Sequence, residues 1–270
     1  MPSDHPDAEH DDDETGTSGQ ARLDGIPDVI KMPKRTAPTS LIDDGRSWMT
    51  EEILKDLIAR AEFPNSLEFR IPELLERPYD APPGWVCVYE CMFTEFEMNF
   101  SLSPLLLRFA AERDVPTSLL THGVVRHIVF TEALTRAAGV TFDRLLFEHV
   151  TDLRTGSTWK RDFKWFHTTM KHDIVFRDYR SKIHWWKNYF FFVKISRASV
   201  GKIKADQIRT EWVTSPGPSK RTKPSSELKK KFKLLKELSH ELWPEVTAVL
   251  EKKRQERRKE QACCFRDPDI

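Results

Sequence analysis

The feature that most constrains the fold is a dense aromatic segment in the second half of the chain. Residues 185–195 read WWKNYFFFVKI, with aromatic or β-branched side chains at most positions. Such side chains favour strands because they pack well on a half-buried pleated surface. A surface loop would leave too much of their apolar area in contact with water. The C-terminal part of this segment is therefore predicted to be a buried strand.

Two further stretches predict partners for that strand. Residues 84–93, which read GWVCVYECMF, begin in a Pro-Pro-Gly turn and are mostly apolar, β-branched or aromatic, which is typical of a strand. Alternating aromatic residues at 163–167 indicate another strand, and the apolar segment 174–176 follows closely. Trp212 is expected to pack back on this domain. Between these strands lie helical patterns, so the predicted fold class is α+β, with a small, mainly antiparallel sheet packed with a helical bundle.

Helices are predicted where a capping residue precedes apolar positions at helical spacing. Thr50 is placed to cap a first helix, and Ser103, followed by Pro104, is placed to cap a second. Gly139 supplies a C-terminal stop for a long third helix, and the sequence Thr-Phe-Asp at 141–143 repeats the cap signal for a fourth. The expected helices cover about residues 51–61, 104–113, 117–138 and 144–154.

Composition divides the chain into segments. The acid-rich start is poor in aromatic residues, which predicts disorder. Because the region after Arg154 is basic, the net charge of +1 is the sum of an acidic segment and a basic segment. In the tail, an apolar stripe among Lys and Arg predicts a long helix that Pro244 kinks or splits. That helix could dock on the domain or self-associate as a coiled coil. The predicted segments are a disordered head (1–45), a short helix with a Pro-rich approach (46–79), the α+β domain (80–213), a linker (214–224), a basic amphipathic helix (225–260) and a disordered tail (261–270).

Cysteine usage and hydropathy predict the compartment. The cysteines, Cys87, Cys91, Cys263 and Cys264, do not resemble a disulfide framework, which favours a reducing environment. No signal peptide opens the chain, and no apolar stretch approaches the roughly 18 residues of a membrane span. We expect an intracellular protein, nuclear or cytoplasmic, that is not secreted and has no membrane partner.

A metal site would have to use Cys87 and Cys91 together with histidines. Residues four apart in a strand lie about 13 Å apart along the chain, whereas two thiolates on one zinc ion lie within roughly 4 Å. Both cysteines are therefore interpreted as buried apolar side chains. Histidines five apart on a helix differ by about 140° around its axis, so they make poor chelators and are interpreted as single hydrogen-bond partners. The histidines considered are His122, His127, His167 and His172.

A nucleotidyl-transfer site would need carboxylates that hold two divalent ions about 4 Å apart. The candidate ligands are Asp143, Asp152, Asp162, Asp173 and Asp178, although acidic residues are also common at solvated helix ends. No Gly-rich phosphate loop, nucleophile elbow or dinucleotide fingerprint occurs. We therefore predict no catalytic residues, no cofactor, no metal and no small-molecule substrate, and hence a protein that is not an enzyme.

Basic residues interleaved with aromatic ones indicate nucleic acid as a candidate partner. Bases stack on aromatic rings while Lys and Arg contact the phosphates. The opposing interpretation is that the aromatic side chains form the core and the basic ones a solvated face. The predicted contacts are Lys160, Arg161, Lys164, Lys182, Lys187, Lys252, Lys253, Arg254, Arg257 and Arg258.

Several segments follow one another in an order that matches a known pattern: 84–90 (GWVCVYE), 99–106 (NFSLSPLL), the helices up to Gly139, 165–166 (WF) and 186–193 (WKNYFFFV). Over roughly residues 80–195, this order resembles the gypsy-type transposase domain of plant retrotransposon-derived proteins. The resemblance implies a retroelement origin but supplies no catalytic residues to carry over. The expected function is a non-catalytic structural or interaction protein with nucleic acid as a candidate ligand. The alternative is a component of an active transposase or integrase that uses divalent metal.

Overall fold

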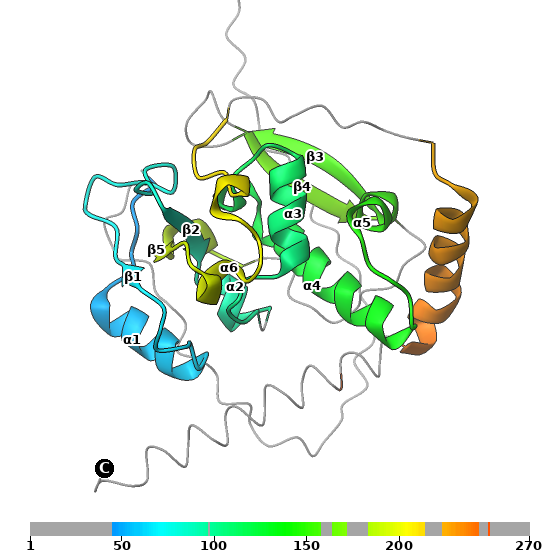
Figure 1. Cartoon of the computed structure of the whole chain (residues 1–270), viewed down its shortest axis with the longest axis horizontal. Helices are drawn as coiled ribbons and strands as arrows, with labels where there is room; N and C mark the ends of the chain where they lie inside the picture. The colour runs from blue at the N-terminus through cyan, green and yellow to red at the C-terminus, as the bar shows by residue number, and fades with distance from the viewer. Residues whose placement is uncertain are drawn as a thin grey trace, which may run out of the picture. The chain divides into compact units, whose positions relative to one another are not determined.

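The computed structural model describes residues 45–96, 98–157, 164–171, 183–213, 223–242 and 248, all within one compact unit. Helices and strands mix along the chain, which confirms the α+β class (Figure 1). The order of elements is α1 (Glu51–Arg60), β1 (Phe69–Arg70), β2 (Trp85–Tyr89), α2 (Cys91–Thr94), α3 (Pro104–Glu112), η1 (Thr117–Leu119), α4 (His122–Ala137), α5 (Arg144–Val150), β3 (Thr151–Ser157), β4 (Lys164–Met170), η2 (Trp186–Asn188), β5 (Phe190–Lys194), α6 (Arg197–Val200) and η3 (Ala205–Gln207).

The predicted aromatic strand is β5, and it lies at the centre of a three-stranded antiparallel sheet. The strand order is β1-β5-β2, with Phe69 opposite Val193 and Cys87 opposite Phe192. Residues 190–193 are fully buried, because both faces of β5 are covered. The short β1 shows that the Pro-rich approach contributes a strand to the main domain.

The start of the described chain is also tied to β5. The backbone N–H of Trp48 donates to the carbonyl of Asn188 at 2.6 Å, and the Ser47 hydroxyl donates to the carbonyl of Phe190 at 2.6 Å. The Trp48 ring packs against Trp185 and Tyr189, with centroids 5.3 and 5.8 Å away. Residues 45–60 therefore belong to the same fold as the sheet.

The second sheet is a two-stranded antiparallel ribbon of β3 and β4. Its register runs from Thr151 opposite Met170 to Ser157 opposite Lys164. The predicted strand at 163–167 is confirmed, but the helix expected to reach about residue 154 ends at Val150. Pairing with β4 turns residues 151–157 into a strand, although their apolar spacing continues the helical pattern.

Two other elements differ from the prediction for tertiary reasons. The helix expected over 117–138 is divided into η1 and α4, because Leu120 adopts an extended conformation and bridges to Phe166 of β4. The strand expected over 84–93 ends at Tyr89, and Cys91 begins the short helix α2. Cys87 and Cys91 are both buried, as expected for packing residues.

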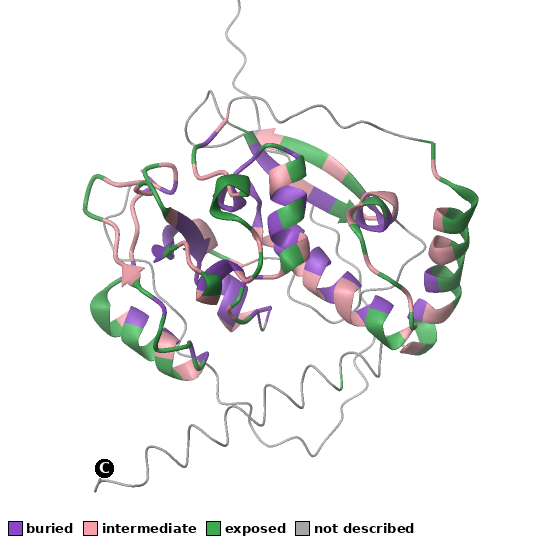
Figure 2. Ribbon diagram, viewed as in Figure 1, coloured by how far each residue is buried: buried purple, intermediate pink, exposed green. Residues whose placement is uncertain are grey.

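Helix starts follow the predicted caps. The side-chain oxygens of Thr50, Ser103 and Asp143 accept hydrogen bonds from the backbone N–H three residues later, at the starts of α1, α3 and α5. Figure 2 shows buried residues on the inner sides of α3 and α4 and exposed ones along the outer side of α1. Trp212 packs back as predicted, with its Nε1 donating to the Ser118 hydroxyl at 2.8 Å.

In the tail, residues 226–242 are helical. Leu235 is fully buried, and the Phe232 ring lies 4.9 Å from the ring of His149 on α5. This part of the predicted tail helix therefore docks on the domain. Pro244, the linker segment 214–222, the head (1–44) and the final residues (249–270) lie outside the described residues, as does the strand expected at 174–176.

Candidate protein-interaction site

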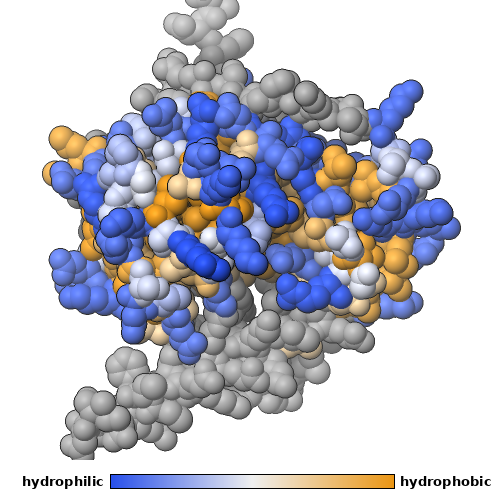
Figure 3. Space-filling view, viewed as in Figure 1, coloured by the Kyte–Doolittle hydropathy of each residue, from blue (hydrophilic) through white to orange (hydrophobic). Residues whose placement is uncertain are grey.

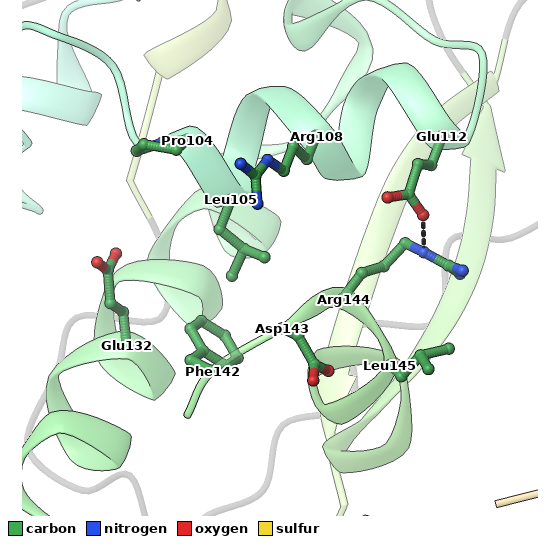
Figure 4. Close-up of a pocket in the computed structure, with 9 residues that line it drawn as sticks. All are labelled: Pro104, Leu105, Arg108, Glu112, Glu132, Phe142, Asp143, Arg144 and Leu145. Atoms are coloured by element: carbon green, nitrogen blue, oxygen red, sulfur yellow. Dashed lines mark ion pairs between the residues drawn. The ribbon is translucent and has the colours of Figure 1, made fainter. Parts of the chain in front are cut away.

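A groove of about 480 Å³ opens between α3, α4 and the start of α5, and we call it the α3–α5 groove (Figure 4). Figure 4 shows Leu105 reaching from α3 toward Phe142, while Leu145 lies on α5 at the other side. The apolar lining is flanked by charged side chains of both signs. The lining residues are Pro104, Leu105, Arg108, Glu112, Glu132, Phe142, Asp143, Arg144 and Leu145.

The apolar part of the groove remains in contact with solvent. Leu145 is 44% exposed, and Leu105 and Phe142 are only partly buried. Figure 3 shows apolar surface gathered over α5 and the helix of residues 226–242. Exposed apolar surface rimmed by polar residues is typical of sites that bind another molecule. The groove therefore offers an apolar floor that this chain leaves partly uncovered.

An ion-pair network fixes the walls of the groove. Glu148 of α5 accepts from Arg113 at the end of α3, with Nη2 at 2.5 Å and Nε at 2.9 Å, and from Arg144 at 2.9 Å. Arg144 also pairs with Glu112. The Arg113 side chain is only 5% exposed, so its charge depends on this carboxylate. The network therefore joins α3 to α5 beside the groove.

One cation of the groove stands apart from this network. Arg108 is exposed on α3, and within the described ranges it forms no ion pair. Figure 4 places its guanidinium above Leu105. Glu132, by contrast, pairs with Arg136, and Asp143 lies 4.0 Å from Lys231 of the tail helix. Arg108 is therefore the charged side chain of this site that can pair with a carboxylate of another molecule.

The ionisable residues considered from the sequence are occupied by structural roles. His127 is 7% exposed, and its Nδ1 lies 2.8 Å from the Thr168 hydroxyl of β4. Burial, with the nearby charges of Arg126 and His122, lowers the pKa of His127 from 6.5 to about 3. Burial raises the pKa of the Cys87 thiol well above its ordinary value. Both groups are thus neutral in the folded protein near pH 7.

The other candidate metal ligands do not form a cluster among the described residues. Asp143 is the N-cap of α5, and Asp152 is exposed on β3. In the part of the chain that the structure describes, no group of three or more His, Cys, Asp or Glu side chains could hold a metal ion. Asp162, His172, Asp173 and Asp178 lie outside the described residues. His167 faces Gly156 across the ribbon, where a Cβ would lie 2.5 Å from its Nε2.

Two of the predicted nucleic-acid contacts lie in the described part of the chain. Lys164 begins β4 and is exposed, and Lys187 is half-buried in η2. Their neighbours Trp165 and Trp186 pack edge to face, with ring centroids 5.3 Å apart. Trp185 is 40% exposed beside them. The remaining predicted contacts, Lys160, Arg161, Lys182, Lys252, Lys253, Arg254, Arg257 and Arg258, lie outside the described residues.

The groove residues were not predicted as a site. Leu105 and Leu145 lie within the helices predicted over 104–113 and 144–154, and no sequence pattern marks Arg108 as part of a site. The sequence does contain one indication of an exposed apolar residue here, because residues 145–147 are three successive large apolar side chains on a short helix. Only one face of a helix packs on the protein core, so one of three successive side chains has to face outward. Which member faces outward depends on how α5 packs against α3.

Comparisons with known proteins give one similarity. No family model matches the chain, and no solved structure matches it. A curated protein of Arabidopsis thaliana, Meiosis-specific protein ASY2, is 25% identical over 167 residues. The match covers 57% of this chain and 12% of the relative, so the chain spans only a small share of that protein's length. Among the described helices, none is long and apolar enough to cross a membrane.

Proposed function

We propose that this protein is a non-catalytic interaction protein and that the α3–α5 groove is its binding site for a peptide segment. The observation that carries the proposal is a solvent-exposed apolar floor next to a cation that forms no ion pair with any described residue. Leu105, Phe142 and Leu145 supply the apolar contact, and Arg108 supplies the charge. Such a site favours a segment with large apolar side chains beside an acidic residue.

The ion pairs that join α3 to α5 support the interpretation of the groove as a binding site. The ion pairs of Arg113 and Arg144 with Glu148 hold both walls before a ligand arrives. A preformed site loses little conformational entropy on binding, so even a small apolar contact gives measurable affinity. The ionisable side chains that could act as nucleophile or base, Cys87 and His127, are buried away from this groove.

A peptide selection tests this proposal. Random peptides displayed on phage and selected against the full chain are expected to converge on two adjacent aliphatic residues next to Asp or Glu. Fluorescence anisotropy then measures their affinity. Changing Arg108→Glu together with Leu145→Glu is expected to weaken binding by about 10-fold to 100-fold, because both the apolar contact and the favourable charge are lost.

The matched control for this measurement is Leu234→Glu. Leu234 is a leucine of similar exposure, 38%, on the helix of residues 226–242, and it does not line the groove. The control is expected to bind the selected peptides with unchanged affinity. Selected peptides that bind the groove variant as well as they bind the native chain would refute the proposal.

Nucleic-acid binding is a second candidate function. Lys164 and Lys187 flank the packed pair Trp165 and Trp186, and Trp185 is exposed nearby. A surface that combines exposed aromatic rings with basic side chains suits a single strand, on which bases stack and phosphates pair. The affinity would depend on salt, because bound lysines release counterions.

A mobility-shift titration with a single-stranded oligonucleotide tests this second candidate. Trp185→Ala is expected to weaken binding by about 1–3 kcal/mol through lost stacking. Lys164→Gln combined with Lys187→Gln is expected to reduce the salt slope by about 1–2. Lys55→Gln, at an exposed lysine on α1, serves as the control. A salt slope that is the same for the native chain and the double variant would exclude these lysines as contacts.

The alternative function, a component of a metal-dependent transposase or integrase, predicts strand transfer with Mg²⁺ or Mn²⁺. An assay for strand transfer with the full chain distinguishes it from the interaction protein proposed above, because an interaction protein gives binding without transfer. We also propose a retroelement origin, on the segment order described above, and an intracellular location. The similarity to a protein named meiosis-specific supports the nucleus as that location.

A further inference from the structure

The loop between β1 and β2 exposes two leucines in a turn. The backbone N–H of Glu76 donates to the carbonyl of Glu73 at 3.0 Å, which makes residues 73–76 a β-turn. The central residues, Leu74 and Leu75, are 69% and 81% exposed. Turn centres usually carry Gly, Pro, Asn, Asp or Ser, and a pair of leucines there has no role in folding that burial could explain. We call this feature the Leu74–Leu75 turn.

Side-chain hydrogen bonds hold the Leu74–Leu75 turn in place. The Glu76 carboxylate accepts from Arg70 and from the backbone N–H of Glu73, both at 2.7 Å. On the C-terminal side, the Asp80 carboxylate accepts from the backbone N–H of Arg77 at 2.8 Å. The two leucines are therefore presented by a preorganised loop, which lowers the entropy lost when they bind.

The Leu74–Leu75 turn and the α3–α5 groove are complementary in chemistry. The turn offers two adjacent apolar side chains next to the Glu73 carboxylate, which is 79% exposed and lies 3.4 Å from Arg70. The groove offers an apolar floor next to Arg108, which has no ion-pair partner among the described residues. The two features thus share exposed apolar surface and carry opposite charges beside it.

The two features cannot meet within one chain. Figure 1 shows the loop beside β1 on one side of the sheet, whereas α3 and α5, which carry lining residues of the groove, lie on the other. Figure 3 shows apolar surface at both places. We propose that the Leu74–Leu75 turn of one copy of this chain docks into the α3–α5 groove of a second copy. This inference rests on the proposed function and names the partner of the groove.

Docking of this kind is heterologous, because the two copies use different surfaces. Each copy keeps a free turn at one end and a free groove at the other, so further copies add head to tail into chains or closed rings. A contact of two leucines and one ion pair is smaller than a standard interface of about 1,600 Å². The association is therefore weak and becomes visible at about 0.1–1 mM protein.

Sedimentation velocity over a concentration series tests the inference with the full chain. The native protein is expected to show a weight-average mass that rises with concentration beyond a dimer. A turn variant, Leu74→Ser with Leu75→Ser, and a groove variant, Arg108→Glu with Leu145→Glu, are each expected to remain monomeric. An equimolar mixture of the two is expected to form a dimer and stop there, because one intact turn meets one intact groove.

Each remaining outcome is decisive. A native chain that stays monomeric at about 1 mM overturns self-docking, and the peptide selection then decides separately whether the groove binds other segments. A mixture of the two variants that stays monomeric also overturns self-docking.

The control variant Leu234→Ser, on the helix of residues 226–242, is expected to associate like the native chain. Its failure to do so would assign self-association to the tail helix instead. Circular dichroism melts confirm that all variants, altered only at exposed positions, are folded.

Discussion

Replacing Glu148 by alanine is expected to lower the free energy of unfolding by about 3–5 kcal/mol. Glu148 is the carboxylate that Arg113 and Arg144 share, and the Arg113 side chain is 5% exposed. Removing the carboxylate leaves the Arg113 guanidinium buried without a counter-charge, which costs far more than an exposed pair would contribute. Urea unfolding followed by circular dichroism measures the change.

The chain provides a matched control for this prediction. Glu112 also pairs with Arg144, but its side chain is 48% exposed. Glu112→Ala is expected to change stability by only about 0–1 kcal/mol, because water and salt screen an exposed ion pair. Equal effects of the two substitutions would contradict a buried network. The double variant Arg113→Met with Glu148→Leu is expected to recover most of the lost stability, since it removes both buried charges together.

Acid is expected to destabilise the fold through His127. Its pKa is about 3 in the folded protein, against an ordinary value of 6.5 in the unfolded chain, first because it is buried and then because of Arg126 and His122. Between these values the unfolded state binds the proton and the folded state does not. Stability is therefore complete above about pH 6.5 and falls toward pH 3, with a slope that approaches about 1.4 kcal/mol per pH unit.

The measurement is the pH dependence of the unfolding free energy in the native chain and in His127→Gln. The variant is expected to have a flatter profile between pH 6.5 and 3, whatever its stability at neutral pH. His149 and His167, whose pKa values burial also lowers, contribute with the same sign and remain in both proteins. His184→Gln, at an exposed histidine, is the control and should keep the native slope. A His127→Gln profile as steep as the native one would show that another group carries the effect.

Local chemistry made part of the fold predictable. Thr50, Ser103 and Asp143 start their helices as expected, because a capping side chain bonds to a backbone N–H only three residues away. Strands β4 and β5 also follow from composition, since aromatic and β-branched residues favour a buried pleated surface. In these cases the residues that decide the structure lie within the element itself.

Elements decided by distant partners were not predictable in the same way. Residues 151–157 form a strand because β4 pairs with them, and Leu120 leaves the helix because it bridges to Phe166. The groove depends on the same kind of information, because Leu145 is exposed only through the way α5 packs on α3. Leu74 and Leu75 are the clearest example of what the sequence pattern cannot predict, since apolar spacing alone does not reveal that both occupy the centre of an exposed turn.

The central position of β5 has a consequence for synthesis of the chain on the ribosome. Among the described strands, β1 and β2 each pair only with β5, although about a hundred residues separate Tyr89 from Phe190. The apolar strand β2 (WVCVY) emerges long before β5 and lacks this pairing partner until residues 190–194 leave the exit tunnel. During that interval it is an open hydrophobic edge, which is prone to aggregate. Slow translation of the intervening segment would lengthen this exposure, so the nascent chain is expected to depend on chaperones that cover extended apolar segments.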